Sequence, residues 1–134
     1  MPHFRISEAA GLLGVSDDTL RRWIDQGVIE ATNDEAGRKV VDGVDLAALA
    51  TREATALDDP SGVERSARNT FVGIVTKVTA DTVMAQVEIQ TGPHRVVSLM
   101  SSEAVRELGL EPGSLAVAVV KATQVIVETP RGRQ

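Results

Sequence analysis

The sequence predicts an α+β protein of two small domains: a helical unit with one β-hairpin, then a five-stranded β-barrel with one short helix. Residues 5–52 show the helical spacing of apolar positions, with short breaks. Residues 69–128 alternate apolar with polar positions and are rich in β-branched side chains. Between them, "DDPSG" at residues 58–62 stops helices and favours turns. We therefore expect domains at residues 1–54 and 66–130, joined by a linker at residues 55–65.

Composition narrows the class of protein before any motif is considered. The 134 residues include no cysteine, which argues against disulfides and thiolate metal sites. No apolar run approaches the roughly 20 residues that a membrane span requires, and the N-terminus lacks the apolar core of a signal peptide. The net charge of −5 argues against a general polyanion binder. A cytoplasmic location without membrane association is expected.

The front domain is expected to contain two short helices around a tight turn, then a hairpin and a third helix. Ser7 is a candidate N-cap of the first helix, and Gly14 supplies the turn. Ser16 caps the second helix, which Gly27 ends. The hairpin turn is expected at residues 33–37, and residues 42–54 form the third helix, packing Leu46 and Leu49 inward. This order is that of a winged helix-turn-helix, in which the second helix enters the major groove.

"ISEAAGLLGVSDDTLRRWIDQGVI", followed by "GRKVVDGVDL", resembles the MerR-like and excisionase-like DNA-binding domains. The resemblance covers about 50 residues. It implies that Thr19 and Arg22 approach bases, while Arg21, Arg38 and Lys39 approach phosphates of double-stranded DNA. The predicted DNA-contacting residues are Ser16, Thr19, Arg21, Arg22, Arg38 and Lys39.

The charge of the front domain favours an alternative. Residues 1–55 contain six Lys/Arg and ten Asp/Glu, a balance of −4. A DNA-binding surface must gather its few cations and turn its acids away, because phosphate neutralisation dominates affinity. The alternative is a helix-turn-helix that makes protein contacts only.

The rear domain is expected to form a small OB-like barrel. Strands are predicted at residues 69–80, 82–91, 94–100, 115–120 and 124–128, with a helix over "SSEAVRELGL" before the fourth strand. Ser101 or Ser102 is expected to cap that helix. Gly73, inside the first strand, indicates a bulge or a close backbone approach.

Polar residues at the strand ends limit the kind of ligand that this domain can bind. "SARN" at residues 66–69 opens the first strand, Ser98 and Ser101 end the third, and Lys121 and Thr123 separate the last two. Hydroxyls, backbone N–H groups and positive charge suit a compact tetrahedral anion. The set lacks the carboxylate or imidazole clusters of a metal-cation site and the aromatic platforms that bind single-stranded nucleic acid.

"SARNTFVGIV", "VVSLMSSEAVRELGLEPG" and "AVAVVKATQVIVE" together resemble the molbindin domain, also called Mop or TOBE, of molybdate-binding proteins and ModE-type regulators. The resemblance implies a molybdate or tungstate ligand held between subunits or paired barrels. By position, the oxyanion-binding residues would be Ser66, Ala67, Arg68, Asn69, Ser101, Lys121, Ala122 and Thr123. A second hydroxyl that the family often carries three residues after the first is replaced here by Ala104.

Two functions follow. The first is a cytoplasmic DNA-binding transcriptional regulator that responds to molybdate or tungstate. The second is a molybdate storage or buffer protein whose helix-turn-helix serves assembly only. We do not expect an enzyme, because there is no cysteine nucleophile and no supportable Ser-His-Asp spacing. Both halves favour a homo-oligomer. Helix-turn-helix domains commonly pair, which favours a dimer, and the resemblance to molbindin barrels implies a hexamer built as a trimer of dimers.

Overall fold

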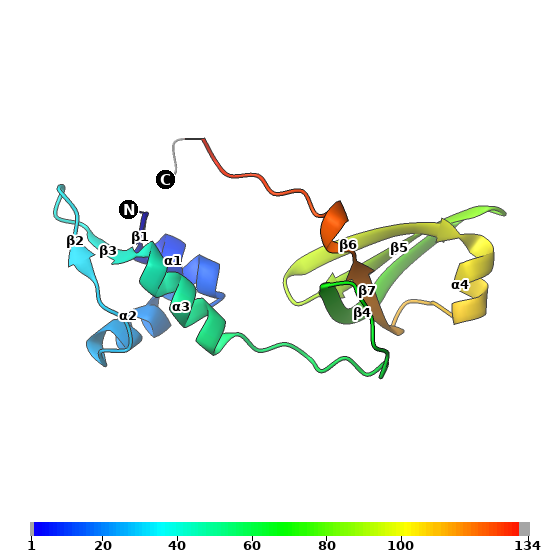
Figure 1. The fold of residues 1–134 in the computed structure, drawn as a ribbon, viewed down its shortest axis with the longest axis horizontal. Helices are drawn as coiled ribbons and strands as arrows, with labels where there is room; N and C mark the ends of the chain where they lie inside the picture. Colours follow the sequence, from blue (N-terminus) through cyan, green and yellow to red (C-terminus); the bar gives the residue numbers. More distant parts are fainter. Residues whose placement is uncertain (1, 132–134) are drawn as a thin grey trace. The chain divides into compact units, whose positions relative to one another are not determined.

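The computed structural model describes residues 2–131, which form two compact units, one of residues 2–55 with 128–131 and one of residues 56–127. Figure 1 shows a mainly helical front unit and a rear unit built on an antiparallel sheet. Among the described residues, no helix has both the length and the apolar character needed to cross a membrane. The α+β fold class expected from the sequence is confirmed, although the rear sheet has four strands and not the five expected.

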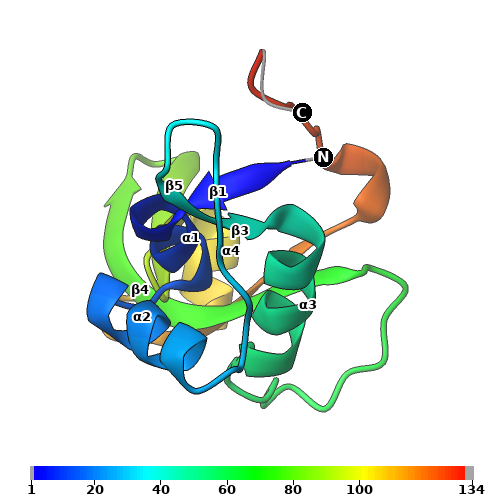
Figure 2. The same cartoon turned by 90° about the vertical axis from the view of Figure 1, so that its left-hand side faces the viewer.

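The front unit has the helix, turn, helix, hairpin, helix order of a winged helix-turn-helix, with one added strand at its start. Its elements are β1 (His3–Arg5), α1 (Ile6–Leu13), α2 (Asp17–Asp25), β2 (Thr32–Asn33), β3 (Lys39–Asp42) and α3 (Gly43–Glu53). The three strands form an antiparallel sheet in the order β1-β3-β2. Figure 2 shows the loop of the β2–β3 hairpin extending beyond the helices of this unit.

Local signals account for most helix boundaries in the front unit. Gly14 ends α1 with a φ of 72°, a conformation that glycine adopts without strain. Ser16 caps α2 as expected, since its side chain accepts the backbone N–H of Thr19. The prediction that Ser7 caps α1 is wrong: the helix begins at Ile6, its N-cap is Arg5, and no side chain caps it. Ile6 is buried, so packing sets this helix start.

The core of the front unit joins its three helices to the hairpin. Leu20 of α2, Leu49 of α3 and Val41 of β3 are fully buried, and Ala9 and Ala10 let α1 approach them closely. Trp23 is partly buried and packs against this cluster. The core fixes α2 and the hairpin within one unit.

The rear unit is a curled four-stranded antiparallel sheet that carries one short helix. Its elements are β4 (Asn69–Ala80), β5 (Met84–Thr91), β6 (His94–Ser101), α4 (Ser102–Leu108), β7 (Leu115–Val120) and the 3-10 turn η1 (Ala122–Gln124). The strand order is β6-β5-β4-β7. The core lies on the inner face, where Val75, Val87 and Ile89 meet Val105 of α4.

Gly73 allows two strands to approach closely, as the sequence predicted. A Cβ atom at this position would meet the backbone oxygen of Gln90 on β5 and would lie 2.9 Å from a methyl group of Ile89. The β4–β5 register also shifts between Val75 and Lys77, which is the mark of a bulge. The sheet is therefore tightly curved at this point.

The fifth strand predicted at residues 124–128 does not form in the single chain. Ala122–Gln124 make a 3-10 turn, and Val125 continues in an extended conformation without strand pairing. Val125, Ile126 and Val127 are 47%, 86% and 86% exposed. A strand requires a neighbouring strand for its backbone hydrogen bonds. The segment has the composition of a strand, but within residues 2–131 it has no pairing partner.

Candidate oxyanion site and nucleic-acid interface

The SARN segment and Lys121 lie at the same end of the rear sheet. Asn69 pairs with Val120 across β4 and β7, and the Asn69 side-chain amide donates to the Val120 carbonyl at 3.1 Å. Arg68 precedes Asn69 and Lys121 follows Val120, so the two cations stand just beyond this pair of strand ends. The structure thus brings together two segments that are 51 residues apart.

Two exposed cations stand at this end of the sheet. Arg68 and Lys121 are exposed, and among residues 2–131 neither takes part in an ion pair. Lys121 stands immediately before η1 and is extended, with φ −64° and ψ 141°. Ala122 and Thr123 form the exposed turn that follows. This end of the sheet presents two uncompensated positive charges together with the Ser66 and Thr123 hydroxyls.

Ser101 lies at the junction of β6 and α4 as the N-cap of the helix. Its Oγ accepts the backbone N–H of Ala104 at 3.0 Å, so the hydroxyl proton remains available to an external acceptor. Ala104 therefore provides the backbone group that orients Ser101, although its side chain supplies no donor.

Ser102 has a structural role. It is 3% exposed, and its hydroxyl donates to the Asp81 carbonyl at 2.7 Å, which fastens α4 to the β4–β5 turn. The Asp81 carboxylate accepts the N–H groups of Met84 and Val83, and these bonds hold its pKa below the ordinary value. Ser102 is thus engaged inside the fold.

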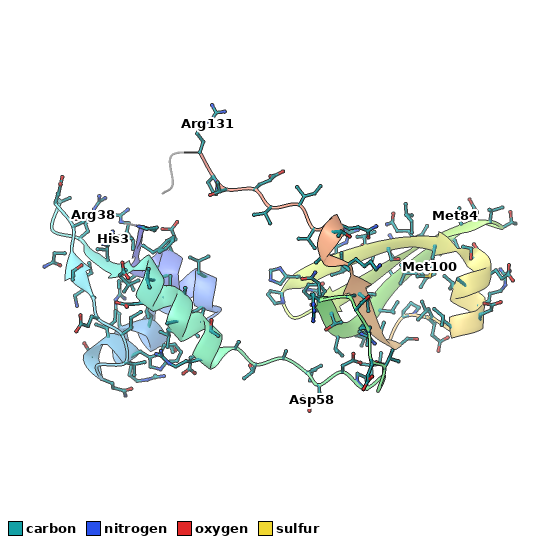
Figure 3. All side chains as sticks on the ribbon, viewed as in Figure 1. His3, Arg38, Asp58, Met84, Met100 and Arg131 are labelled. Carbon is teal, nitrogen blue, oxygen red and sulfur yellow. The ribbon has the colours of Figure 1, made fainter. Side chains whose placement is uncertain are left out.

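Ser101 and Lys121 lie at opposite ends of the rear unit. Ser101 pairs with Met84, which follows the β4–β5 turn, whereas Asn69 begins the twelve-residue strand β4 (Figure 3). Figure 1 likewise shows α4 and η1 at opposite ends of this unit. β6 and β7 are also the two outer strands of the sheet. A single chain therefore does not gather the predicted donors around one anion.

The inner face of the half-barrel is open between β6 and β7. A hollow of about 480 Å³ there is lined mainly by apolar side chains, including Val87, Val96, Met100, Leu110 and Ala118. Closed barrels of this size fill the corresponding space with side chains. Within residues 2–131, no group of three His, Cys, Asp or Glu side chains could hold a metal ion.

In the front unit, the predicted DNA-contacting residues of α2 are exposed or partly exposed. The Ser16 hydroxyl donates to the Thr19 hydroxyl at 2.9 Å, so these two side chains orient one another at the helix start. Arg21 and Arg22 are exposed, and the Arg21 guanidinium lies 4.0 Å from the Asp18 carboxylate. An exposed pair at this distance contributes little to stability.

The hairpin carries Arg38 and Lys39 on a turn that Asp34 organises (Figure 3). The Asp34 carboxylate accepts the N–H groups of Ala36 and Arg38, each at 2.9 Å, and the Arg38 Nε at 3.2 Å. The bond from the Arg38 N–H is the main cause of a lowered Asp34 pKa. Sequence reasoning missed this role of Asp34, although an Asp three residues before a glycine is a turn signal.

Family comparison assigns the two halves separately. The sequence model of the family described as "TOBE domain" matches residues 65–127, and that of the family described as "MerR family regulatory protein" matches residues 5–40. A probable molybdenum-pterin-binding protein of Haemophilus influenzae is 44% identical over 63 residues, covering 46% of this chain and 91% of the relative. The molybdenum transport protein ModE of Herbaspirillum seropedicae is 32% identical over 68 residues, covering 50% of this chain and only 25% of ModE.

A solved structure has the same rear fold. The cytoplasmic molybdate-binding protein ModG, crystallised with molybdate bound, is 41% identical, with a TM-score of 0.50. The match covers 54% of this chain and 52% of ModG. The names of these relatives describe transport or binding of molybdenum, and none names a catalysed reaction.

Proposed function

Because the chain belongs to the TOBE domain family, we propose that it is a molybdate- or tungstate-binding transcriptional regulator that binds its oxyanion between subunits. The observation that carries the proposal is the split donor set. Arg68 and Lys121 stand at one end of the sheet and Ser101 at the other. A site containing all three requires a second copy of the chain.

In this site the two cations supply charge and the remaining groups supply hydrogen bonds. Arg68 and Lys121 form no ion pair among the described residues, so their charge is available to a dianion. The Ser66, Ser101 and Thr123 hydroxyls and the backbone N–H groups of Ala67, Asn69 and Ala122 complete the set. Charge-assisted hydrogen bonds of this kind are stronger than neutral ones.

Homo-oligomerisation is supported by the open half-barrel. Its apolar hollow and the exposed segment Val125–Val127 are both unfavourable in a lone chain in water. Placing that segment of one copy against the half-barrel of another buries both surfaces. We propose a cytoplasmic dimer, or a hexamer built from three dimers.

The anion regulates the chain through assembly. A ligand shifts an equilibrium only by its differential affinity for the two states. The split site supplies that difference, because only the assembled form presents all the donors. Assembly also sets the number of helix-turn-helix units that reach DNA together.

Titration calorimetry with molybdate tests the site. We expect saturable binding to the full chain, and the Arg68→Ala, Lys121→Ala double variant should lose most of it. A matched control removes two exposed cations elsewhere in the rear unit, Lys77→Ala with Arg106→Ala, and should bind like the wild type. Undiminished binding in the first variant would show that the site is assigned wrongly.

A second candidate is a storage or buffer protein whose front unit serves assembly only. The balance of −4 over residues 1–55 favours it, as do Asp17 and Asp18 in the first turn of α2. Gel shifts at low salt, using DNA from upstream of the protein's own coding region, separate the two functions. A sequence-selective complex that responds to molybdate supports regulation, and no complex in either condition supports storage.

A further inference from the structure

The chain just before the SARN segment is closed into a loop by an ion pair. The Arg65 guanidinium lies 3.0 Å from the Asp59 carboxylate, and the two side chains are 19% and 32% exposed. Arg65 also donates to the Ser61 hydroxyl at 2.7 Å, while the Ser61 N–H donates to Asp59 at 2.8 Å. Gly62, with a φ of 65°, allows the tight reversal between them. We call this set of contacts the Asp59–Arg65 clip.

The clip is attached directly to the predicted anion-binding segment. Arg65 precedes Ser66, and Asn69 is already fixed to β7 through its bond to Val120. Ser66, Ala67 and Arg68 therefore lie between two anchored points. Before the clip, Leu57 lines a shallow hollow over Ile74 and Leu115 of the sheet.

We propose that Asp59 and Arg65 are positioning residues that hold Ser66–Arg68 ready to bind the oxyanion. This inference rests on the proposed anion-binding function. Ordering a flexible segment at the moment of binding costs conformational entropy, which reduces the observed affinity. The clip fixes that segment beforehand, so binding loses less entropy.

The sign of one substitution distinguishes positioning from simple electrostatics. Asp59 carries a negative charge close to a site for an anion. If charge alone mattered, Asp59→Asn would tighten molybdate binding, and Arg65→Met would weaken it. A positioning role predicts that both substitutions weaken binding, because each opens the same clip.

The experiment measures molybdate affinity calorimetrically on the full chain. We expect Asp59→Asn and Arg65→Met each to weaken binding roughly tenfold, which corresponds to about 1.4 kcal/mol. The double variant should be no weaker than either single variant, since the two residues act as one unit. Arg65→Lys, which keeps the positive charge, should recover most of the affinity.

Asp58→Asn is the matched control. Asp58 is the adjacent, exposed carboxylate in the extended stretch before the clip, and it makes no hydrogen bond or ion pair among the described residues (Figure 3). It loses the same charge at nearly the same place, so we expect its affinity to stay within about twofold of the wild type. The clip lies outside both hydrophobic cores, so the thermal midpoint of the ligand-free protein should be the same in all variants.

Two outcomes overturn the inference alone: wild-type affinity in Asp59→Asn, or tighter binding in that variant alongside weaker binding in Arg65→Met. If the wild-type chain binds no molybdate, the proposed function fails and this inference fails with it.

Discussion

Ile126→Asp tests whether the exposed C-terminal segment joins two copies of the chain. Ile126 is 86% exposed, and its neighbours Val125 and Val127 are also exposed. These three residues follow β7 and η1 in the chain, and none of them lines the open hollow of the half-barrel. An aspartate in this segment leaves the single chain unchanged but places a charge wherever the segment is buried.

The expected magnitude follows from the area that assembly would cover. Burying an isoleucine side chain contributes about 1.5–3 kcal/mol. In a two-fold symmetric dimer each substitution acts twice, so the loss is about 3–6 kcal/mol, or roughly 10²–10⁴ in the dissociation constant. Desolvation of the introduced carboxylate increases this loss further.

Sedimentation velocity over a range of concentrations measures the effect, and native mass spectrometry reports the subunit count. Leu12→Asp, at a position 62% exposed in the front unit, is the control for adding a charge at an apolar surface residue. Far-ultraviolet circular dichroism checks that both variants fold. The reasoning is refuted if Ile126→Asp assembles like the wild type, or if the wild-type chain is monomeric at every concentration.

Further predictions concern the two units separately. Gly73→Val places a side chain against the backbone of Gln90 and should destabilise the rear unit by about 1–3 kcal/mol, measured by urea unfolding. An unchanged urea midpoint would contradict the close approach of the two strands. Leu20→Ala should lower the free energy of unfolding of the front unit by about 2–5 kcal/mol, because Leu20 is fully buried there. The unfolding midpoint of the front unit should fall, while the midpoint of the rear unit should not change. If the hairpin contacts phosphate, Arg38→Ala should reduce the slope of log DNA affinity against log salt concentration by about 1, because one fewer counterion is released on binding. The Asp34 carboxylate has a lowered pKa, so its contribution to the stability of the hairpin is complete above the ordinary aspartate pKa of 3.8. That contribution is lost as the pH falls through the lower pKa of the folded state. Hairpin protection in hydrogen exchange at pH 5 should therefore match that at pH 7, and Asp34→Asn should lower it at both.

Local signals in the sequence predicted most of the helices and strands, but they did not predict which strands pair with one another. Gly14 and Ser16 were identified correctly because each acts through its own backbone or its immediate neighbours. Gly73 was identified as a point of close approach, but the strand that it approaches was not predicted. The contact of Asn69 with Val120 depends on the strand order, which periodicity does not encode. The same strand order separates Ser101 from Lys121.

The fifth strand shows the same limit. Alternation and β-branched residues predict a strand at residues 124–128, and this prediction is wrong for the described chain, where no strand follows β7. They do not say which edge supplies the hydrogen bonds, or whether that edge belongs to the same chain. At Ser7 a local signal gave a wrong prediction. Ser7 is a good capping residue, but the helix starts one residue earlier, at Ile6, because Ile6 is buried in the core.

The acidic front unit and the open rear unit have a common explanation in the proposed regulator. A helix-turn-helix with few cations binds DNA weakly when alone, because each phosphate contact contributes through counterion release. Asp34 holds Arg38 in place, and Asp42 accepts two N–H groups at the start of α3, so part of the acidity serves the fold itself. Linking two such units raises the effective concentration of the second once the first is bound. An anion that completes its site only between copies would then control DNA binding through the number of linked units, without any change within α2.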